Sequence, residues 1–318
     1  CDSNTRKHCL DALFEKMPLI CDFQIIEIPA GEHNKSLEIT MQLWKDMLNY
    51  HMDKDSLMIN LGGGMICDIG GFAASAFKRG IPFVNVPTTL MAMVDAGFGG
   101  KTAVNFEDSK NQIGFFNNPE AVIIDAGFLS TLDRASVLSG SAEMLKHALI
   151  HDAAYWEELK NALKTDGIKN INLIEKSIGI KNYYTSIDYF ERGQRKILNF
   201  GHSFGHVFES MLLRSNNPQH HGLCIAAGII CESFLSEKKA GLTKKDQSCI
   251  NSSILENYDF SGFRGITADE GFFEFLTKDK KRINNKIIMP LLQRIGKAEL
   301  YEVHDEDCFV DALNYFQT

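Results

Sequence analysis

The sequence lacks any apolar run near the roughly 18 residues of a membrane span, and its N-terminus has no basic region followed by an apolar one. It also lacks an excess of positive charge, because 33 Lys and Arg stand against 41 Asp and Glu, for a net charge of -8. Binding nucleic acid through bulk electrostatics needs clustered Lys and Arg, so that class of function is disfavoured. The 8 cysteines have no CxxC spacing, which suggests neither a disulfide framework nor a cysteine zinc site. We therefore expect a soluble cytoplasmic protein that binds neither nucleic acid nor a membrane.

With 318 residues the chain is long for one hydrophobic core, since single cores stop growing at about 250 to 300 residues. Its hydrophobic content of 44% and its charged content of 23% are ordinary for a globular protein. We therefore expect two folded domains. A truncated start is an open alternative, because the chain opens at Cys1 and not at a methionine.

The first 133 residues alternate short apolar runs, which predict strands, with helical patterns. This alternation is typical of a parallel sheet whose strands are connected by helices. Ligands bind such open sheets at the carboxyl ends of the strands. Strands are predicted at residues 23–30, 56–64, 82–89 and 120–127, and helices at residues 37–51 and 70–80.

From residue 134 onward the pattern becomes helical, with no strand of comparable quality before residues 286–292. We predict an α/β protein with an N-terminal Rossmann-like parallel-sheet domain at residues 1–133 and a mainly α-helical domain at residues 134–318. A loop rich in Asn, Pro and His at residues 211–222 interrupts the helical domain and is a candidate functional loop. The helices are predicted at residues 134–150, 153–164, 172–187 and 223–241.

Two stretches of the first domain carry residues suited to a nucleotide. In "LMINLGGGMICD", the glycines 62–64 lie between a predicted strand and a helix, where backbone amides can approach a phosphate. The GxGxxG fingerprint is not met, so a tight turn without a ligand remains an equal alternative. The second stretch, "VPTTLMAMVDAGFGGKTAVN", combines threonines, Asp95, glycines and Lys101, and Lys110 and Asn111 follow it. Its alternative is a solvated loop with surface lysines.

The helical domain supplies candidate ligands for a catalytic metal, which takes three protein ligands from His, Asp or Glu and leaves one position open. These candidates are Glu143, His202, His206, His220 and His221. Residues four apart share a helix face, so the local spacing makes His202 and His206 co-ligands. A single histidine on an apolar helix is more often a hydrogen-bonded core residue, and this alternative stays open. Spacing alone does not choose between them.

Six motifs, in this order and spacing, resemble the 3-dehydroquinate synthase family, and the resemblance covers nearly the whole chain. The motifs are "GGGMICDIGGFAASAFKRG", "VPTTLMAMVDAGFGGKTAVN", "KNQIGFF", "SAEMLKHALI", "RKILNFGHSFGHVFES" and "HGLCIAAG".

The resemblance implies a shikimate-pathway enzyme that converts 3-deoxy-D-arabino-heptulosonate 7-phosphate (DAHP) to 3-dehydroquinate and phosphate. It implies NAD, a divalent metal that is zinc or alternatively cobalt, and a homodimer. In the family a hydroxyl is oxidised by NAD, phosphate is eliminated, the ketone is reduced and the ring closes by an internal aldol step. NAD is regenerated, so the expected class is a carbon–oxygen lyase.

Position by position, the resemblance assigns the metal to Glu143, His202 and His221, with His220 as a competing neighbour. His206 becomes a group on the substrate side, which overrules the local HxxxH interpretation. The implied catalytic residues are Asp95, Lys101, Lys146, Arg195, Asn199 and His206. The implied substrate contacts are Arg79, which would reach the neighbouring subunit's substrate, and Lys110, Asn111, Lys181 and Lys280. The implied NAD contacts are Asp2, Asn4, Glu32, Lys35, Gly63, Gly64, Asp68, Thr88, Thr89, Phe128 and Thr131.

Other classes of function are weighed against this one. Another sugar phosphate cyclase would share the fold and cofactors, but Lys110, Asn111, Arg195, Asn199 and His206 suit an acidic substrate. A metal-dependent polyol dehydrogenase of the same superfamily would release NADH. A catalytically silent NAD-binding homologue would have lost a metal ligand or the cleft lysines, and neither loss is seen.

Overall fold

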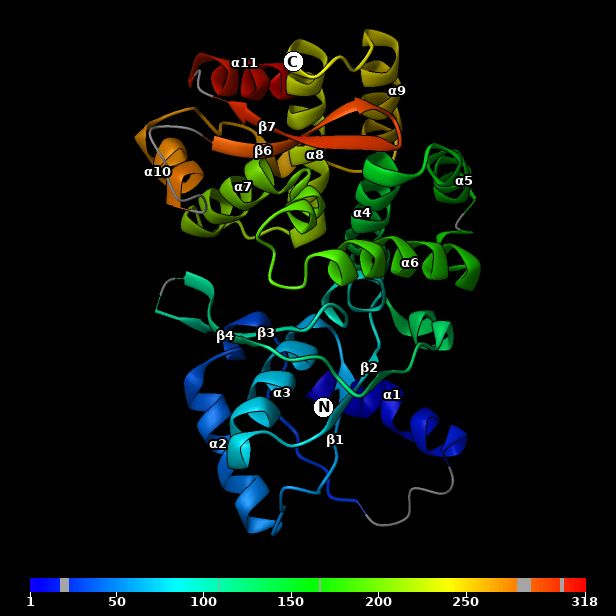
Figure 1. The fold of residues 1–318 in the computed structure, drawn as a ribbon, viewed down its shortest axis with the longest axis vertical. Helices are drawn as coiled ribbons and strands as arrows, with labels where there is room; N and C mark the ends of the chain where they lie inside the picture. Colours follow the sequence, from blue (N-terminus) through cyan, green and yellow to red (C-terminus); the bar gives the residue numbers. More distant parts are fainter. Residues whose placement is uncertain (18–22, 108, 166, 279–286, 304–305) are drawn as a thin grey trace. The chain divides into compact units, whose positions relative to one another are not determined.

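The computed structural model describes residues 1–17, 23–107, 109–165, 167–278, 287–303 and 306–318. Lys280, expected as a substrate contact, lies outside the described residues. The chain divides into two compact units, Cys1–Asp133 (unit 1) and Arg134–Thr318 (unit 2) (Figure 1). Unit 1 contains a parallel sheet and unit 2 is mainly helical, so the predicted fold class is confirmed. Among the described residues, no helix has both the length and the apolarity needed to cross a membrane.

A parallel sheet with the strand order β1-β2-β5 lies at the centre of unit 1. The helix α3 (Gly64–Ala76) connects β1 (Met58–Gly62) to β2 (Phe83–Pro87), and β5 (Ala121–Val122) pairs with the other side of β2. Because β1 and β2 are parallel, their carboxyl ends lie at one edge, and the glycine turn and the two threonines follow there. The other helical segments of unit 1 are α1 (Ser3–Lys16), α2 (Leu37–Asn49), η1 (Glu32–Asn34), η2 (Phe77–Arg79), η3 (Ala92–Ala96) and η4 (Ala126–Thr131).

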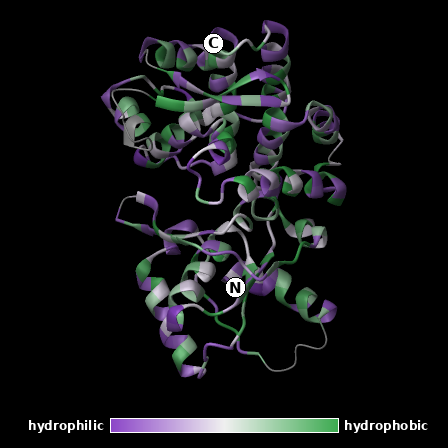
Figure 2. Cartoon of the chain, in the orientation of Figure 1, coloured by the Kyte–Doolittle hydropathy of each residue, from purple (hydrophilic) through white to green (hydrophobic). Residues whose placement is uncertain are grey.

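The helix α2 shows how the sequence pattern produces packing in unit 1. Its buried residues Thr40, Leu43 and Met47 are three and four positions apart, which places them on one helix face. Figure 2 shows hydrophilic and hydrophobic residues interspersed along this helix, as expected when only one face is covered. Leu43 packs into one hydrophobic cluster with Ile69 and Phe72 of α3.

One strand prediction for unit 1 was wrong, and one hairpin was not predicted. Residues 23–30 form no strand, because this segment pairs only through a single bridge between Ile28 and Asp2. Residues 101–116, where the sequence predicted no strand, form an antiparallel hairpin of β3 (Lys101–Phe106) and β4 (Ser109–Phe116). No residue of β4 is fully buried, so its sequence carries no alternation of apolar residues that would have revealed a strand.

Helices make up most of unit 2, and an antiparallel pair of strands lies between α10 (Glu270–Lys278) and α11 (Glu306–Gln317) in the chain. The strands are β6 (Ile287–Arg294) and β7 (Lys297–Val303). The long helices are α4 (Arg134–His151), α5 (Ala153–Lys164), α6 (Ile171–Ile187), α7 (His202–Arg214), α8 (His221–Lys239), α9 (Lys244–Leu255), α10 and α11. The short ones are η5 (Gly167–Lys169), η6 (Gln194–Asn199) and η7 (Ser261–Phe263).

Glycines let the start of α7 lie directly against α8. A Cβ atom on Gly228 would lie 1.9 Å from the carbonyl oxygen of Gly201, and one on Gly205 would lie 2.6 Å from Cδ1 of Ile225. Around this contact, Phe204, Phe208 and residues of α8 belong to one hydrophobic core cluster of unit 2. The close contact fixes where the first turn of α7 lies relative to α8.

We expect Gly228→Ala to destabilise the protein by about 1 to 3 kcal/mol, because the added methyl group meets backbone that cannot rotate away. Gly179→Ala on the exposed face of α6 is the matched control: no atom lies within 4 Å of its new Cβ. This control should stabilise by about 0.5 to 1 kcal/mol through helix propensity. Urea unfolding measures both, and equal stabilities for the two variants would contradict the close contact.

Candidate active site

The centre of the candidate site is the carboxylate of Glu143 on α4, which is completely buried. Its Oε1 lies 3.5 Å from Nε2 of His202 and 3.7 Å from Nε2 of His221, while its Oε2 forms an ion pair with Lys146. A buried carboxylate is costly unless positive charge compensates it. This arrangement therefore suits a cation.

The two histidines that face Glu143 are oriented by their other ring nitrogen. Nδ1 of His202 lies 3.2 Å from the carbonyl oxygen of Phe200, and Nδ1 of His221 lies 3.0 Å from Oε2 of Glu209. Both partners are acceptors, so each Nδ1 carries the hydrogen and donates it. Each Nε2 is then available to bind a metal, which is the usual arrangement of metal-binding histidines. Three oxygen and nitrogen donors thus point at one place, as a divalent metal requires.

The protonation states agree with this role. Burial would raise the pKa of Glu143, but Lys146 and then the two histidines outweigh it and hold the pKa well below its usual range. Burial lowers the pKa of His202 to about 3, so this imidazole is neutral. Burial also acts to lower the pKa of His221, but Glu143 and Glu209 together raise it to about 10. A metal that binds at His221 would therefore replace a proton there.

A glycine brings His221 to Glu143. The amide of Gly222 donates to Oγ of Ser139 over 3.1 Å, and a Cβ on Gly222 would lie only 1.9 Å from the carbonyl oxygen of Ser139. The first turn of α8 therefore rests on α4 one helical turn before Glu143. His220, the competing candidate, precedes α8 and is exposed.

His206 lies one turn after His202 on α7, and its ring centroid is 5.2 Å from that of His202 and 5.9 Å from that of His221. One nitrogen of each of these three histidines lies within 4.8 Å of the others, so a ligand set with three histidines is also geometrically available. The set with Glu143 gives the buried carboxylate a role as a ligand, whereas in the alternative set it is only the partner of Lys146 and the imidazoles. Both sets share His202 and His221.

Arg195 and Asn199 lie on η6, where a tight turn holds them. Asp188 at the end of α6 accepts hydrogen bonds from the backbone amides of Arg192, Gly193 and Arg195 at 3.0, 2.7 and 3.1 Å. Arg195 is 3% exposed and its Nη1 donates to the carbonyl oxygen of Tyr189. On the same short helix, Nδ2 of Asn199 donates to Oε1 of Glu191 over 2.8 Å. These two side chains are thus positioned by the protein itself.

In unit 1, three residues expected at the cofactor or substrate meet around Lys35. Its Nζ lies 2.5 Å from Oδ2 of Asp68 and 2.5 Å from Oδ1 of Asn111, and it is 3% exposed. Glu32 is also near, with Oε1 3.9 Å from the same Nζ. Sequence reasoning missed Asn105, whose Oδ1 accepts from the amide of Asn111 over 3.0 Å and whose Nδ2 donates to Glu32.

The glycine turn and the threonine segment lie side by side at the edge of the sheet. A Cβ on Gly63 would lie 3.1 Å from Cγ2 of Thr89, and one on Gly64 would lie 3.0 Å from Cβ of Ala96. The amide of Thr88 donates to the carbonyl oxygen of Gly62 over 2.9 Å. Packing alone therefore favours glycine at both positions, whether or not a ligand binds.

The remaining predicted residues occupy varied positions. Asp2 is the N-cap of α1, and its carboxylate accepts from the amide of Thr5 over 2.8 Å. Arg79 is exposed and has a left-handed backbone, with φ at 70°. In unit 1, Asn4, Lys101, Lys110 and Thr131 are exposed, Asp95 is half-buried in η3, and Phe128 is buried in η4; in unit 2, Lys181 is buried in α6.

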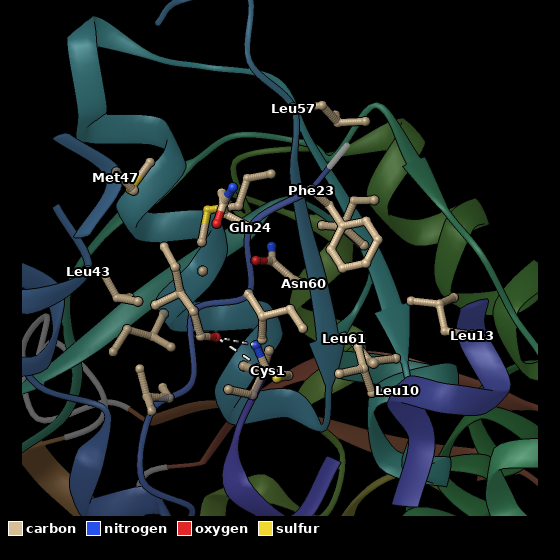
Figure 3. A pocket seen from close by; sticks show the side chains of 18 of the residues that line it. Cys1, Leu10, Leu13, Phe23, Gln24, Leu43, Met47, Leu57, Asn60 and Leu61 are labelled. Carbon is tan, nitrogen blue, oxygen red and sulfur yellow. Dashed lines mark hydrogen bonds between the residues drawn. The ribbon is translucent and has the colours of Figure 1, made fainter. Parts of the chain in front are cut away.

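Unit 1 also contains a pocket beside β1 that is not part of the candidate site (Figure 3). Leu10, Leu13, Phe23 and Met47 belong to its wall, and Asn60 contributes an amide. Among the described residues, no Asp, Glu, Lys, Arg or His lines this pocket. None of the predicted site residues lines it.

The fold and the cluster of Glu143, His202 and His221 define an α/β protein with a candidate divalent-metal site. The chain belongs to the 3-dehydroquinate synthase family: residues 25–139 match the family's N-terminal region and residues 140–282 match its C-terminal region.

Named relatives agree with this membership. A 3-dehydroquinate synthase of Parabacteroides distasonis is 39% identical over 99% of this chain and 90% of its own length. Among solved structures, 2-epi-5-epi-valiolone synthase of Streptomyces hygroscopicus subsp. jinggangensis 5008, with bound NAD+ and Zn2+, matches with a TM-score of 0.86 and 25% identity, over 99% of this chain and 89% of that one. A 2-deoxy-scyllo-inosose synthase matches with a TM-score of 0.83 and 24% identity, over 98% of this chain and 88% of that one, and shares the fold.

We expect His221→Ala to weaken zinc binding by more than about 100-fold, because it removes a donor that faces Glu143. His220→Ala is the matched control, since this neighbour is exposed and should leave the affinity unchanged. Glu143→Gln should also lose the metal and keep the fold. Competition with a chromogenic chelator measures the three affinities. Loss of zinc in His220→Ala with retention in His221→Ala would show that the wrong histidine was named.

Asp188→Asn tests how much the Asp188 carboxylate stabilises the turn that holds Arg195, and how this contribution to the free energy of unfolding depends on pH. The three backbone amides outweigh the effect of burial and lower the pKa of Asp188, so its stabilisation is fully present above the unfolded pKa of about 3.9 and is lost as pH falls through the folded value. The difference in the free energy of unfolding between wild type and Asp188→Asn should be constant from pH 7 to about pH 5 and shrink below about pH 4. Glu175→Gln on the same helix is the control, and a difference for Asp188→Asn that grows in acid would contradict the account.

Proposed function

We propose that this protein is a 3-dehydroquinate synthase, which converts DAHP to 3-dehydroquinate and phosphate. The observation that carries the proposal is the buried carboxylate of Glu143 facing two histidine nitrogens whose other ring nitrogens are already bonded. Membership of the family and the 39% identity to a 3-dehydroquinate synthase support the choice of reaction.

Glu143, His202 and His221 are proposed to hold the metal, with zinc as the first choice and cobalt as the second. A divalent metal bound there supplies Lewis acidity, which lowers the pKa of a substrate hydroxyl. The residues fit such an ion because one is an anion and two present neutral ring nitrogens once His221 has lost its proton. Lys146 pairs with the other oxygen of Glu143 and would keep that carboxylate in place.

NAD is proposed as the redox cofactor, and the bound NAD+ of 2-epi-5-epi-valiolone synthase supports it. It supplies a hydride acceptor that is regenerated within the cycle. The positions proposed to bind it lie in unit 1, at the carboxyl edge of the parallel sheet and around Lys35. At that edge the amide of Gly63 and the hydroxyls of Thr88 and Thr89 offer hydrogen bonds without a net charge.

The substrate is proposed to be bound by positive and hydrogen-bonding side chains. DAHP carries a carboxylate and a phosphate, and Arg195 offers the planar fork that suits such groups. Arg195 and Asn199 are held by Tyr189, Asp188 and Glu191, so little conformational freedom is lost when a ligand binds. His206 is proposed to act on the substrate side, one helical turn from His202. Asp95, Lys101, Lys110, Asn111, Lys146, Lys181 and Arg79 remain proposed contacts.

A homodimer and a cytoplasmic location complete the proposal. The cytoplasmic location is supported by the cysteines, because no disulfide joins any two of the described ones. The family resemblance supports the dimer.

Two related functions are the alternatives. Another sugar phosphate cyclase is disfavoured, because the identity to 2-epi-5-epi-valiolone synthase is 25% against 39% to the Parabacteroides distasonis enzyme. A polyol dehydrogenase would turn over NAD stoichiometrically, whereas the proposed reaction leaves NAD unchanged.

Incubation of the purified protein with zinc, NAD and DAHP should release phosphate and give a product that dehydroquinase dehydrates. No NADH should accumulate in the steady state. Glu143→Gln should reduce phosphate release to background. Absence of phosphate release at saturating zinc and NAD, or a steady rise of NADH absorbance with a polyol, would refute the proposal.

A further inference from the structure

Glu232 is a completely buried acid in the middle of α8, between the buried residues Cys231 and Ser233. Its carboxylate reaches across to the start of α7. Oε2 accepts from the amide of Gly201 over 2.8 Å, and Oε1 accepts from the amides of Ser203 and Phe204 over 2.8 and 3.4 Å. A charged side chain is rarely buried completely in a protein interior unless it forms hydrogen bonds or ion pairs there.

These hydrogen bonds supply a cap that α7 does not have on its own. Its N-cap residue is Gly201, which has no side chain to accept the first amides of the helix. Gly201 has a left-handed backbone with φ at 81°, and a Cβ there would lie 2.7 Å from Cγ1 of Ile229. Glu232 therefore replaces the usual Ser or Asp cap from a neighbouring helix.

The capped turn is the one that carries the proposed metal ligand, because His202 is the first residue of α7. The same turn presents the carbonyl oxygen of Phe200 to Nδ1 of His202. Glu232 accepts hydrogen bonds from the amides of Gly201 and Ser203, the residues on either side of His202. The direction of Nε2 of His202 toward Glu143 thus depends on these bonds. A shift of this turn would move the donor atom directly.

Charge gives Glu232 a second effect. The N-terminus of a helix carries a partial positive charge, roughly half an elementary charge, which disfavours a cation beside the first residue. A carboxylate that accepts the first amides of α7 offsets this charge within the same turn. The ligand His202 can then sit at a helix start without repelling the dication.

We propose that Glu232 is a positioning residue for the metal site: it fixes the first turn of α7 and neutralises its positive end, so that His202 can bind a divalent cation. The inference rests on the proposed metal site. Glu232 would act through His202, by way of its hydrogen bonds to the amides of Gly201 and Ser203.

The test measures the zinc affinity of the apoprotein by chelator competition, together with thermal unfolding. Glu232→Gln keeps the shape but loses the charge and turns one acceptor into a donor, so we expect zinc affinity to fall about 10- to 100-fold with a folded protein. Ser233→Ala is the matched control on the same helix. It removes the buried hydrogen bonds of Ser233 to Asn251 and to the carbonyl oxygen of Ile230, but not the cap. It should lower the melting temperature and leave zinc affinity unchanged.

Each outcome separates the two proposals. If the wild-type protein binds no zinc, the metal site itself is wrong. If wild type binds zinc and Glu232→Gln binds it equally well, the role of Glu232 is overturned. If Glu232→Gln does not fold, Glu232→Asp decides: it keeps the charge but shortens the reach, so it should fold with weakened zinc affinity, and an unchanged affinity would overturn the proposal. If Ser233→Ala loses as much zinc affinity as Glu232→Gln, the loss reflects general destabilisation of the protein, and the proposed role of Glu232 is overturned.

Discussion

The burial of the Glu143 carboxylate is the constraint on which the candidate site depends. An unpaired carboxylate in a protein interior costs several kcal/mol, and here Lys146 and the facing imidazoles provide the compensation. Both histidines that face it are the first residues of their helices, α7 and α8. The amino-terminal ends of these helices are positive, so they favour the carboxylate even before a metal binds.

The same positive helix ends disfavour a divalent cation at this place, and the surrounding carboxylates offset their charge. Glu209 accepts from His221 and Glu232 accepts from the first amides of α7, so each histidine or its helix start is bonded to a second carboxylate. Small residues make this possible, because Gly222 and Gly228 allow α8 to lie against α4 and α7 at backbone contact. Packing and electrostatics at this site therefore depend on each other. The carboxylates can compensate the positive helix ends only if the helices are packed closely.

Much of the fold could be predicted from the spacing of apolar residues along the sequence. The strands β1 and β2 were visible as apolar runs, and the helices α4 to α6 and α8 were visible from their apolar faces. The segment at residues 23–30 has the same composition as a strand, but a strand also needs a partner, which a local pattern cannot reveal. The hairpin of β3 and β4 was missed for the opposite reason, since its second strand is polar and exposed.

Some residues of the candidate site could likewise be predicted from the sequence, and others could not. The resemblance of six motifs drew attention to Glu143, His202 and His221, and their donor atoms do lie together, while the local HxxxH spacing alone suggested a different pair. Glu209 and Glu232 were not found, because their roles depend on which helices are neighbours. The one signal for Glu232 was a lone acid within an apolar helical run.

The measurement that tests the account most directly is X-ray diffraction from zinc-loaded crystals at the zinc absorption edge. The account predicts one anomalous peak at about 2.0 to 2.2 Å from an oxygen of Glu143 and from Nε2 of both His202 and His221. A peak bound by His202, His206 and His221, with the Glu143 carboxylate outside the coordination sphere, would contradict it.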